Sequence, residues 1–94
     1  MIKYQVKGEL IQFDDINTFY SDVKSLLEKH DEIILDFDKV NFISSSGVGK
    51  IITIQNLLLN TKKMIKVVNL KKEPKKILKE MSFFHFTPNI SFEE

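Results

Sequence analysis

Three consecutive hydroxyl side chains, Ser44, Ser45 and Ser46, lie in the stretch NFISSSGVGKII, between an apolar segment and a pair of glycines. Apolar residues resume after them at helical spacing, so we expect a strand to end before the serines and a helix to begin among them. The first backbone N–H groups of a helix lack partners within the helix and carry a partial positive charge. A serine there can cap the helix, and a phosphate on it would be stabilised by the same groups.

Gly47 and Gly49 follow the serines directly. Two glycines in the first turns of a helix cost about 1 kcal/mol each relative to alanine, which suggests that a partner approaches the backbone closely there. The alternative interpretation is structural, because serines cap helices very often and glycines allow close packing within a chain. Residue types and spacing alone leave both interpretations open.

Four segments have the patterns of β-strands. The segment 2–13 begins with alternating apolar and polar side chains, which predicts a strand with one solvent-exposed face, bent at Gly8. The run at 32–37 is apolar between charged residues and predicts a strand buried on both faces. A β-branched run at 63–70 and a short one at 89–92 indicate two more strands.

Three segments between these strands have helical periodicity. The first follows Asp14 and Asp15, either of which can cap it, and the second runs from the serines to Asn60 and Thr61. The third includes Pro74, which suits the first turn of a helix. The predicted core consists of apolar residues from these helices and strands: Phe19, Val23, Leu26, Ile34, Leu35, Val48, Ile52, Val67, Leu70 and Leu78.

The order β–(β)–α–β–α–β–α–(β) predicts one α/β domain over residues 1–94, with right-handed βαβ units and a mixed, mostly parallel β-sheet. Binding sites on parallel sheets form beyond the carboxyl ends of the strands. We therefore expect a partner-binding surface at that edge, formed by Asp14, Asp15, Ser44, Ser46, Gly47, Gly49, Asn69, Lys71 and Lys72 around Ser45.

The composition argues against several classes of protein. The chain has no cysteine, which excludes disulfides, thiolate metal sites and a cysteine nucleophile. No apolar run approaches the roughly 20 residues of a membrane span, and no signal peptide is recognisable, so we expect a cytoplasmic protein. His30 and His85 are expected to lie away from the serines, as surface or packing residues. We therefore expect no enzyme, no metal and no cofactor.

Charge is distributed unevenly along the chain. Residues 1–45 hold five lysines and nine acidic residues, whereas residues 46–94 hold nine lysines and four acidic residues. This asymmetry suggests a protein partner that is steered electrostatically, although solvated lysine-rich helices are the simpler explanation. The chain has no arginine, which argues against nucleic acid as the partner.

The segments VKGEL, LDFDKVNFISSSGVG, KVVNL and EPKKILKEM occur in an order and spacing that resemble the STAS domain family over nearly the whole chain. The best-known members of this family are bacterial anti-sigma factor antagonists. The resemblance implies a small STAS-like fold, shortened at the amino terminus. It also implies a non-enzymatic regulatory module that binds a GHKL-type kinase acting as an anti-sigma factor.

The resemblance further implies that the kinase phosphorylates the domain and that a metal-dependent serine phosphatase reverses this. The position that matches the family's phospho-acceptor is Ser45. Ser44 is a weaker candidate because it occupies the place of the family's aspartate, and Ser46 is expected to cap the helix with its hydroxyl.

Three departures from the family pattern leave other functions open. Ser44 replaces the aspartate, and Ile11 stands where an acidic residue often follows Gly-Glu-Leu. A strand that usually precedes this segment is expected to be missing, and the exposed sheet edge would favour a homodimer or strand addition. The main alternative is a phosphorylation-independent STAS scaffold subunit of a transport, lipid-trafficking or signalling complex, and a small-molecule or nucleotide-binding domain is a third.

Overall fold

Strands and helices alternate along the computed structural model, which describes residues 2–81 and 87–93. The elements are β1 (Ile2–Gln5), α1 (Phe13–Lys29), β2 (Glu32–Asp36), α2 (Ser45–Leu58), β3 (Met64–Val68), α3 (Lys72–Glu80) and β4 (Ile90–Phe92). This order confirms the predicted alternation. The prediction for His85 lies outside the described residues. None of the described helices is long and apolar enough to cross a membrane.

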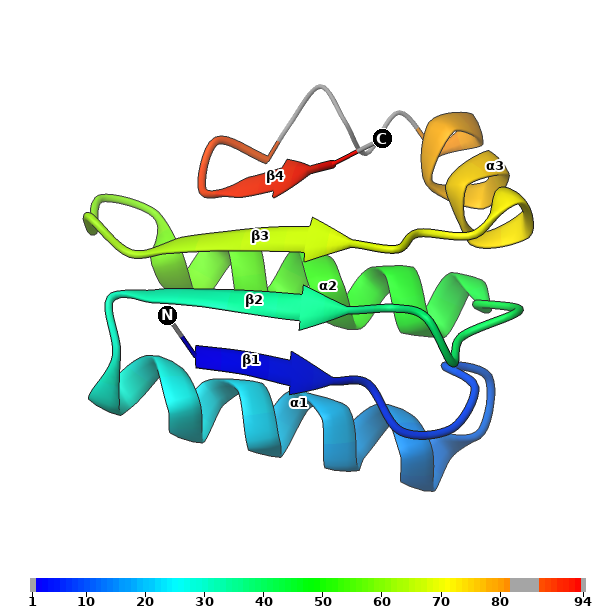
Figure 1. Cartoon of the computed structure of the whole chain (residues 1–94), viewed down its shortest axis with the longest axis horizontal. Helices are drawn as coiled ribbons and strands as arrows, with labels where there is room; N and C mark the ends of the chain where they lie inside the picture. Colours follow the sequence, from blue (N-terminus) through cyan, green and yellow to red (C-terminus); the bar gives the residue numbers. More distant parts are fainter. Residues whose placement is uncertain (1, 82–86, 94) are drawn as a thin grey trace.

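The four strands form one sheet in the order β1-β2-β3-β4, and every neighbouring pair is parallel. Figure 1 shows α1 and α2 on one side of this sheet, where they pack against each other. The fold is therefore the small parallel α/β arrangement that the sequence predicts. β1 and β4 are the two edge strands, and strand addition at the β1 edge stays a prediction.

The side chains of β2 are buried unequally on its two faces, which corrects the prediction of a strand buried on both. Ile33 and Leu35 are fully buried on the helix side, whereas Ile34 is only half-buried. Ile34 lies in register between Lys3 and Lys66, both exposed. Each strand is followed by a helix and then by the next strand of the sheet, and such connections are almost always right-handed. The helices therefore lie on one side of the sheet, and the other face remains open.

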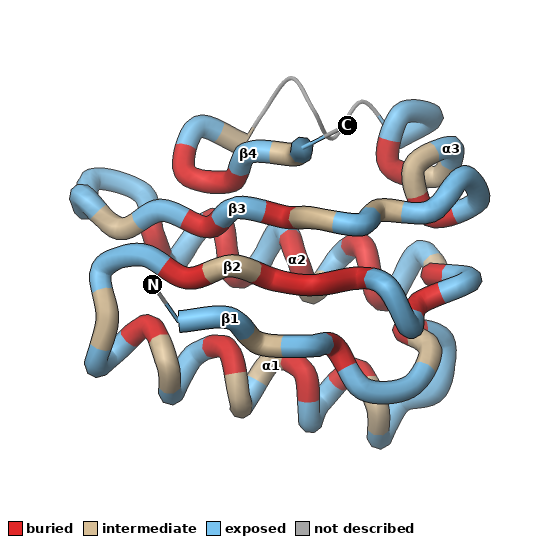
Figure 2. Tube along the Cα trace, viewed as in Figure 1, coloured by how far each residue is buried: buried red, intermediate tan, exposed pale blue. Residues whose placement is uncertain are grey.

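Most of the predicted core is buried, and Figure 2 shows it on the inner faces of the helices and along β2. Phe19, Val23, Leu35, Val48, Val67 and Leu78 are buried, whereas Leu26, Ile34 and Leu70 are half-buried. Ile52 is 41% exposed, so its predicted burial is wrong. The helix α2 is apolar on several sides and turns Ile51 and Ile54 toward the core instead.

The connection from β1 to α1 is a loop, not a continued strand. Gly8 has a positive φ of 71°, which turns the chain, and Leu10 makes only an isolated parallel bridge with Ile43. The N-cap of α1 is Gln12, so the prediction that Asp14 or Asp15 caps this helix is wrong. Both aspartates lie in the first turn of α1, where their negative charge suits the helix dipole.

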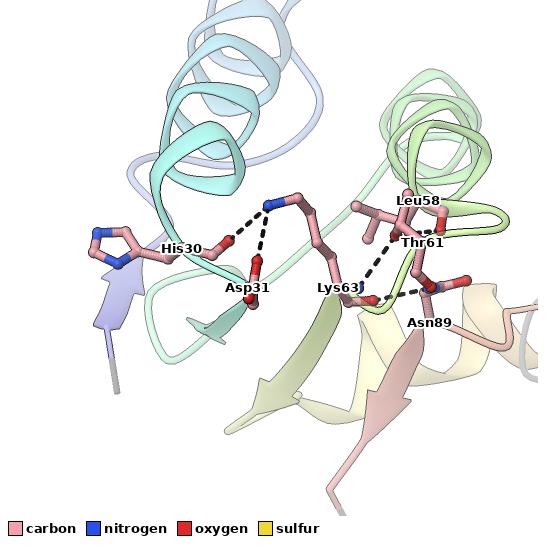
Figure 3. Close-up of polar contacts among 6 residues, drawn as sticks. All are labelled: His30, Asp31, Leu58, Thr61, Lys63 and Asn89. Atoms are coloured by element: carbon pink, nitrogen blue, oxygen red, sulfur yellow. Dashed lines mark hydrogen bonds and ion pairs between the residues drawn. The ribbon is translucent and has the colours of Figure 1, made fainter.

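The amino-terminal end of the sheet is joined by polar contacts. In Figure 3, Lys63 reaches the His30 carbonyl oxygen at 3.4 Å and the Asp31 carboxylate at 3.2 Å, while Asn89 Nδ2 donates to the Lys63 carbonyl oxygen at 2.8 Å. Asn89 also exchanges hydrogen bonds with the buried Gln55 of α2. His30 ends α1 here, at the opposite end of the sheet from the serines, as predicted.

Candidate functional site

The carboxyl ends of the strands share one end of the sheet with the starts of all three helices (Figure 1). Ser44 at the start of α2 contacts Leu10 in the loop before α1. Lys71, the N-cap of α3, donates from Nζ to Asn41 Oδ1 at 2.9 Å. The prediction that the serines, Asp14–Asp15 and the segment 69–72 gather at one edge is therefore confirmed.

Glu9 joins two of the loops at this end. Its carboxylate accepts the backbone N–H of Asn41 at 3.0 and 3.1 Å and that of Phe42 at 2.6 Å. Lys71 in turn holds the Asn41 side chain, so three loops are connected through one asparagine. No residue pattern marks Glu9 as a site residue in the sequence, although Glu9 belongs to the VKGEL segment.

Asp36 is a buried carboxylate at the end of β2, only 5% exposed. Its Oδ1 accepts hydrogen bonds of 2.9 Å from Asn69 Nδ2 and from the Asp38 backbone N–H, and Lys3 Nζ lies 3.6 Å from Oδ2. The Asn69 hydrogen bond is the main cause that lowers the pKa of Asp36, despite the opposing effect of burial. Asn69, predicted to contact a partner, is thus engaged within the chain, and no sequence signal identified Asp36.

Ser44, and not Ser46, caps α2, which corrects the prediction. The Ser44 hydroxyl accepts the Gly47 backbone N–H at 3.1 Å and donates to the Leu10 carbonyl oxygen at 3.1 Å. The cap must have an extended backbone so that its oxygen reaches the N–H three residues on, and Ser44 has φ −87° and ψ 168°. Ser46 already lies inside the helix and is exposed.

Ser45 is the first residue of α2 and is exposed. Its hydroxyl makes no hydrogen bond to any of the described residues. A kinase could reach this oxygen, and the unpaired N–H groups of the first turn lie beside it. These features agree with the accessibility expected of an acceptor, and the role itself stays a prediction.

The two glycines differ in their surroundings. A Cβ on Gly47 would lie 2.6 Å from the Leu10 carbonyl oxygen and 2.8 Å from Ile43 Cγ1, so Gly47 is needed for packing within the chain. The close approach at Gly47 is thus explained within the chain, and its contact with a partner stays a prediction. Gly49 is exposed, and beyond its own helix no described atom lies within 4 Å of where its Cβ would be.

A groove of about 390 Å³ runs between α1 and α2 beside the serines. Ile11 and Phe13 form part of one wall and are 44% and 76% exposed. The lining residues, from the loop before α1 and from both helices, are Ile11, Phe13, Ile16, Asn17, Ser46, Gly49, Lys50 and Thr53. Ile11, Phe13 and Lys50 were not among the residues predicted for the binding surface.

The remaining predicted residues do not line this groove. Asp14 is exposed, whereas Asp15 is half-buried with its carboxyl group against Gly8. Lys72, the first residue of α3, is exposed. The described residues include no group of three or more histidine, aspartate or glutamate side chains that could hold a metal ion. The surface thus offers a free hydroxyl, exposed apolar side chains and lysines, which suit contact with another protein.

Comparison with known protein families finds a match to the family described as STAS domain, over residues 1–92. This match spans all seven helices and strands of the described structure. A search of curated proteins finds no match to the chain.

Proposed function

Because the chain belongs to the STAS domain family, we propose that it is a regulatory module resembling anti-sigma factor antagonists. Members of this family are in general non-catalytic regulatory or scaffold modules. In this proposal the domain binds a GHKL-type kinase in the bacterial cytoplasm through the surface around Ser45. Phosphorylation of Ser45 ends the binding, and a metal-dependent phosphatase restores it.

The position of Ser45 is the observation that carries this proposal. Its hydroxyl is free and exposed at the first residue of a 14-residue helix. Exposed apolar side chains lie in the neighbouring loops and at the start of α1, namely Ile11, Phe42 and Phe13. An exposed apolar patch beside a modifiable hydroxyl is the arrangement that a switchable protein interface requires.

The switch follows from charge. A phosphate adds about 1.5 to 2 negative charges at pH 7 to a contact formed by small and apolar residues. The helix N-terminus stabilises that charge in the free domain, whereas a close interface would have to desolvate it. Phosphorylation of Ser45 is therefore expected to weaken binding without unfolding the domain.

The proposal is tested with the purified domain, ATP and the kinase encoded beside its gene. Phosphate should be found on Ser45 by mass spectrometry and should disappear in Ser45→Ala. Calorimetry should show that Ser45→Asp weakens kinase binding far more than Ser45→Ala does, with Ser46→Ala as the matched neighbour. Binding that is indifferent to Ser45→Asp, with no phosphate on any serine, would reject the switch.

One observation favours the alternative of a phosphorylation-independent scaffold. Because Ser44 stands in place of the family's aspartate, Ser45 has no negative charge directly before it. The Ser44 hydroxyl is used within the fold, in hydrogen bonds with Gly47 and Leu10. Such a scaffold would bind its partner equally well with serine, alanine or aspartate at position 45. The same calorimetric series therefore separates the two functions.

A further inference from the structure

Gly49 has no evident role within the fold. It is the fifth residue of α2, where alanine is favoured over glycine because glycine gains more conformational freedom when the helix unfolds. Space does not require a glycine, since a Cβ would meet no described atom outside its own helix within 4 Å. Its φ is not in the positive range, in contrast to that of Gly8. The absence of a side chain at position 49 therefore has a function only if a group outside the described structure occupies the space above Gly49.

The space over Gly49 is part of the groove between α1 and α2. Ile11 and Phe13 stand on the α1 side, and Thr53 lies one turn further along α2. Phe13 is 76% exposed, the largest exposed fraction among the exposed large apolar side chains of the described residues. Exposed bulky side chains around an open glycine form a recess whose size suits one large apolar side chain.

The charge at the groove is positive. Lys50 is the only charged side chain among the described residues that line it. Its ammonium group lies 4.8 Å from the centre of the Tyr20 ring, and this cation–π contact holds it between α1 and α2. The N-terminal turns of α2 add partial positive charge on the same side. A carboxylate beside the apolar side chain would complement both.

We propose that this groove binds a segment of the partner protein that places one bulky apolar side chain over Gly49 and an acidic side chain beside Lys50. The inference rests on the proposed function in one respect, namely that this surface binds a protein. It specifies the chemistry of that partner. It also places Ser46, whose free hydroxyl lines the groove, inside the contact, and Ser45 next to it.

A small probe with the same two groups tests the inference without the natural partner. The probe is N-acetyl-L-phenylalanine, titrated into the ¹⁵N-labelled full-length domain and followed by two-dimensional NMR. Saturable shifts are expected at the amides of Phe13, Ser46, Gly49 and Lys50, with a dissociation constant in the millimolar range because the ligand is small. The neutral analogue N-acetyl-L-phenylalaninamide should bind several-fold more weakly.

Three variants locate the probe. Gly49→Leu fills the recess and should abolish the shifts, and Lys50→Gln should remove the preference for the carboxylate. Asn56→Leu, two turns further along α2, exposed and outside the groove, is the matched control and should bind as the wild type does. If Gly49→Leu loses NMR dispersion, Gly49→Ala replaces it, with a weaker but measurable effect expected.

The outcomes separate this inference from the proposed function. Shifts that are absent, that lie elsewhere, or that persist in a folded Gly49→Leu would overturn it. Self-association that depends on concentration and is lost in Gly49→Leu would also overturn the inference, because a second copy of the chain would then occupy the groove. The probe could bind in the groove while the Ser45→Asp domain still binds its partner. That result would reject the phosphorylation switch but would support the proposed chemistry of the groove.

Discussion

The side chain of Asn69 donates a 2.9 Å hydrogen bond to Oδ1 of Asp36, which couples the loop after β3 to the buried end of β2. The Asn69 backbone has a positive φ of 58°, which asparagine tolerates better than most residues. The same Asp36 oxygen accepts the Asp38 N–H. One buried carboxylate therefore fixes two loops of the candidate site, and its ionisation matters to both.

We expect the stability of the domain to fall in acid because of Asp36. Its pKa is lower in the folded state than the usual 3.8, so its contribution is present above about pH 4 and is lost as the pH falls through the folded-state value. Asp36→Asn should cost on the order of 1.5–3 kcal/mol at pH 7, as expected for hydrogen bonds to a charged group. Urea unfolding from pH 7 down to pH 3 should show a flatter pH dependence in the variant.

Asp38→Asn is the matched control, because Asp38 is exposed and lies two residues further on, in the loop after β2. It removes the same charge and should leave most of the stability at pH 7 in place. If the Asp36→Asn domain were as stable at pH 7 as the wild type, the stabilising role given to the Asp36 carboxylate would be contradicted.

Ser44→Ala is expected to destabilise the domain by about 1 kcal/mol, within the 0.5–2 range for a lost helix cap. The change removes the acceptor for the Gly47 N–H and the donor to the Leu10 carbonyl oxygen. Ser46→Ala, within the same turn of α2, should change the free energy of unfolding by less than about 0.5 kcal/mol. Equal costs for the two variants, measured by urea unfolding, would show that Ser44 is not the cap.

The sequence predicted the elements well because their periodicities are clear. The first helix repeats its apolar residues on one side, and Phe19 and Val23 of that stripe are indeed buried. The orientation of α2 could not be predicted in the same way. Apolar residues occur on most of its sides, so only the position of the sheet decides that Ile51 and Ile54 are buried and Ile52 is not.

The location of the site could be predicted from the sequence, but its hydrogen bonds and packing could not. Strand–helix alternation was sufficient to locate the serines, at the start of α2, and Asn69, after β3, at one end of the sheet. The choice of Ser44 as the cap depends on its backbone angles and on the Leu10 carbonyl oxygen, 34 residues earlier. Gly47 and Gly49 look alike in the sequence, and only the folded chain shows that one is packed and the other open.

Gly47→Ala should therefore destabilise the fold, whereas Gly49→Ala should not. The new methyl group at Gly47 would meet a backbone oxygen at 2.6 Å, and we expect a loss of about 1–3 kcal/mol, as for overpacking of a core. Gly49→Ala meets open space and should gain up to about 1 kcal/mol from helix propensity. Thermal and urea unfolding of both variants measure this difference, and the same sign for both would contradict it.

The contributions of Gln55 and Asn89 to stability should be coupled, because the two residues hydrogen-bond to each other in the core. Gln55 Nε2 donates to Asn89 Oδ1 at 2.8 Å, and the Asn89 N–H donates to Gln55 Oε1 at 3.0 Å. Asn89→Ala leaves Nε2 of Gln55, a residue only 2% exposed, without its acceptor, and removes the side-chain donor to the Lys63 carbonyl oxygen. We expect each alanine variant to cost about 1–3 kcal/mol, the penalty for a buried polar group without a partner.

The double variant Gln55→Ala/Asn89→Ala should cost less than the sum of the single variants, by about 0.5–3 kcal/mol, because it leaves fewer stranded groups. Hydrogen exchange gives a second measurement, since the Ile65 N–H donates to the Asn89 carbonyl oxygen at 2.8 Å and joins β3 to the turn before β4. Its protection should fall in Asn89→Ala and remain in Asn56→Ala, an exposed neighbour on α2. Strictly additive costs would mean that the two side chains do not act as a unit and that β4 is held by its pairing with β3 and its apolar contacts.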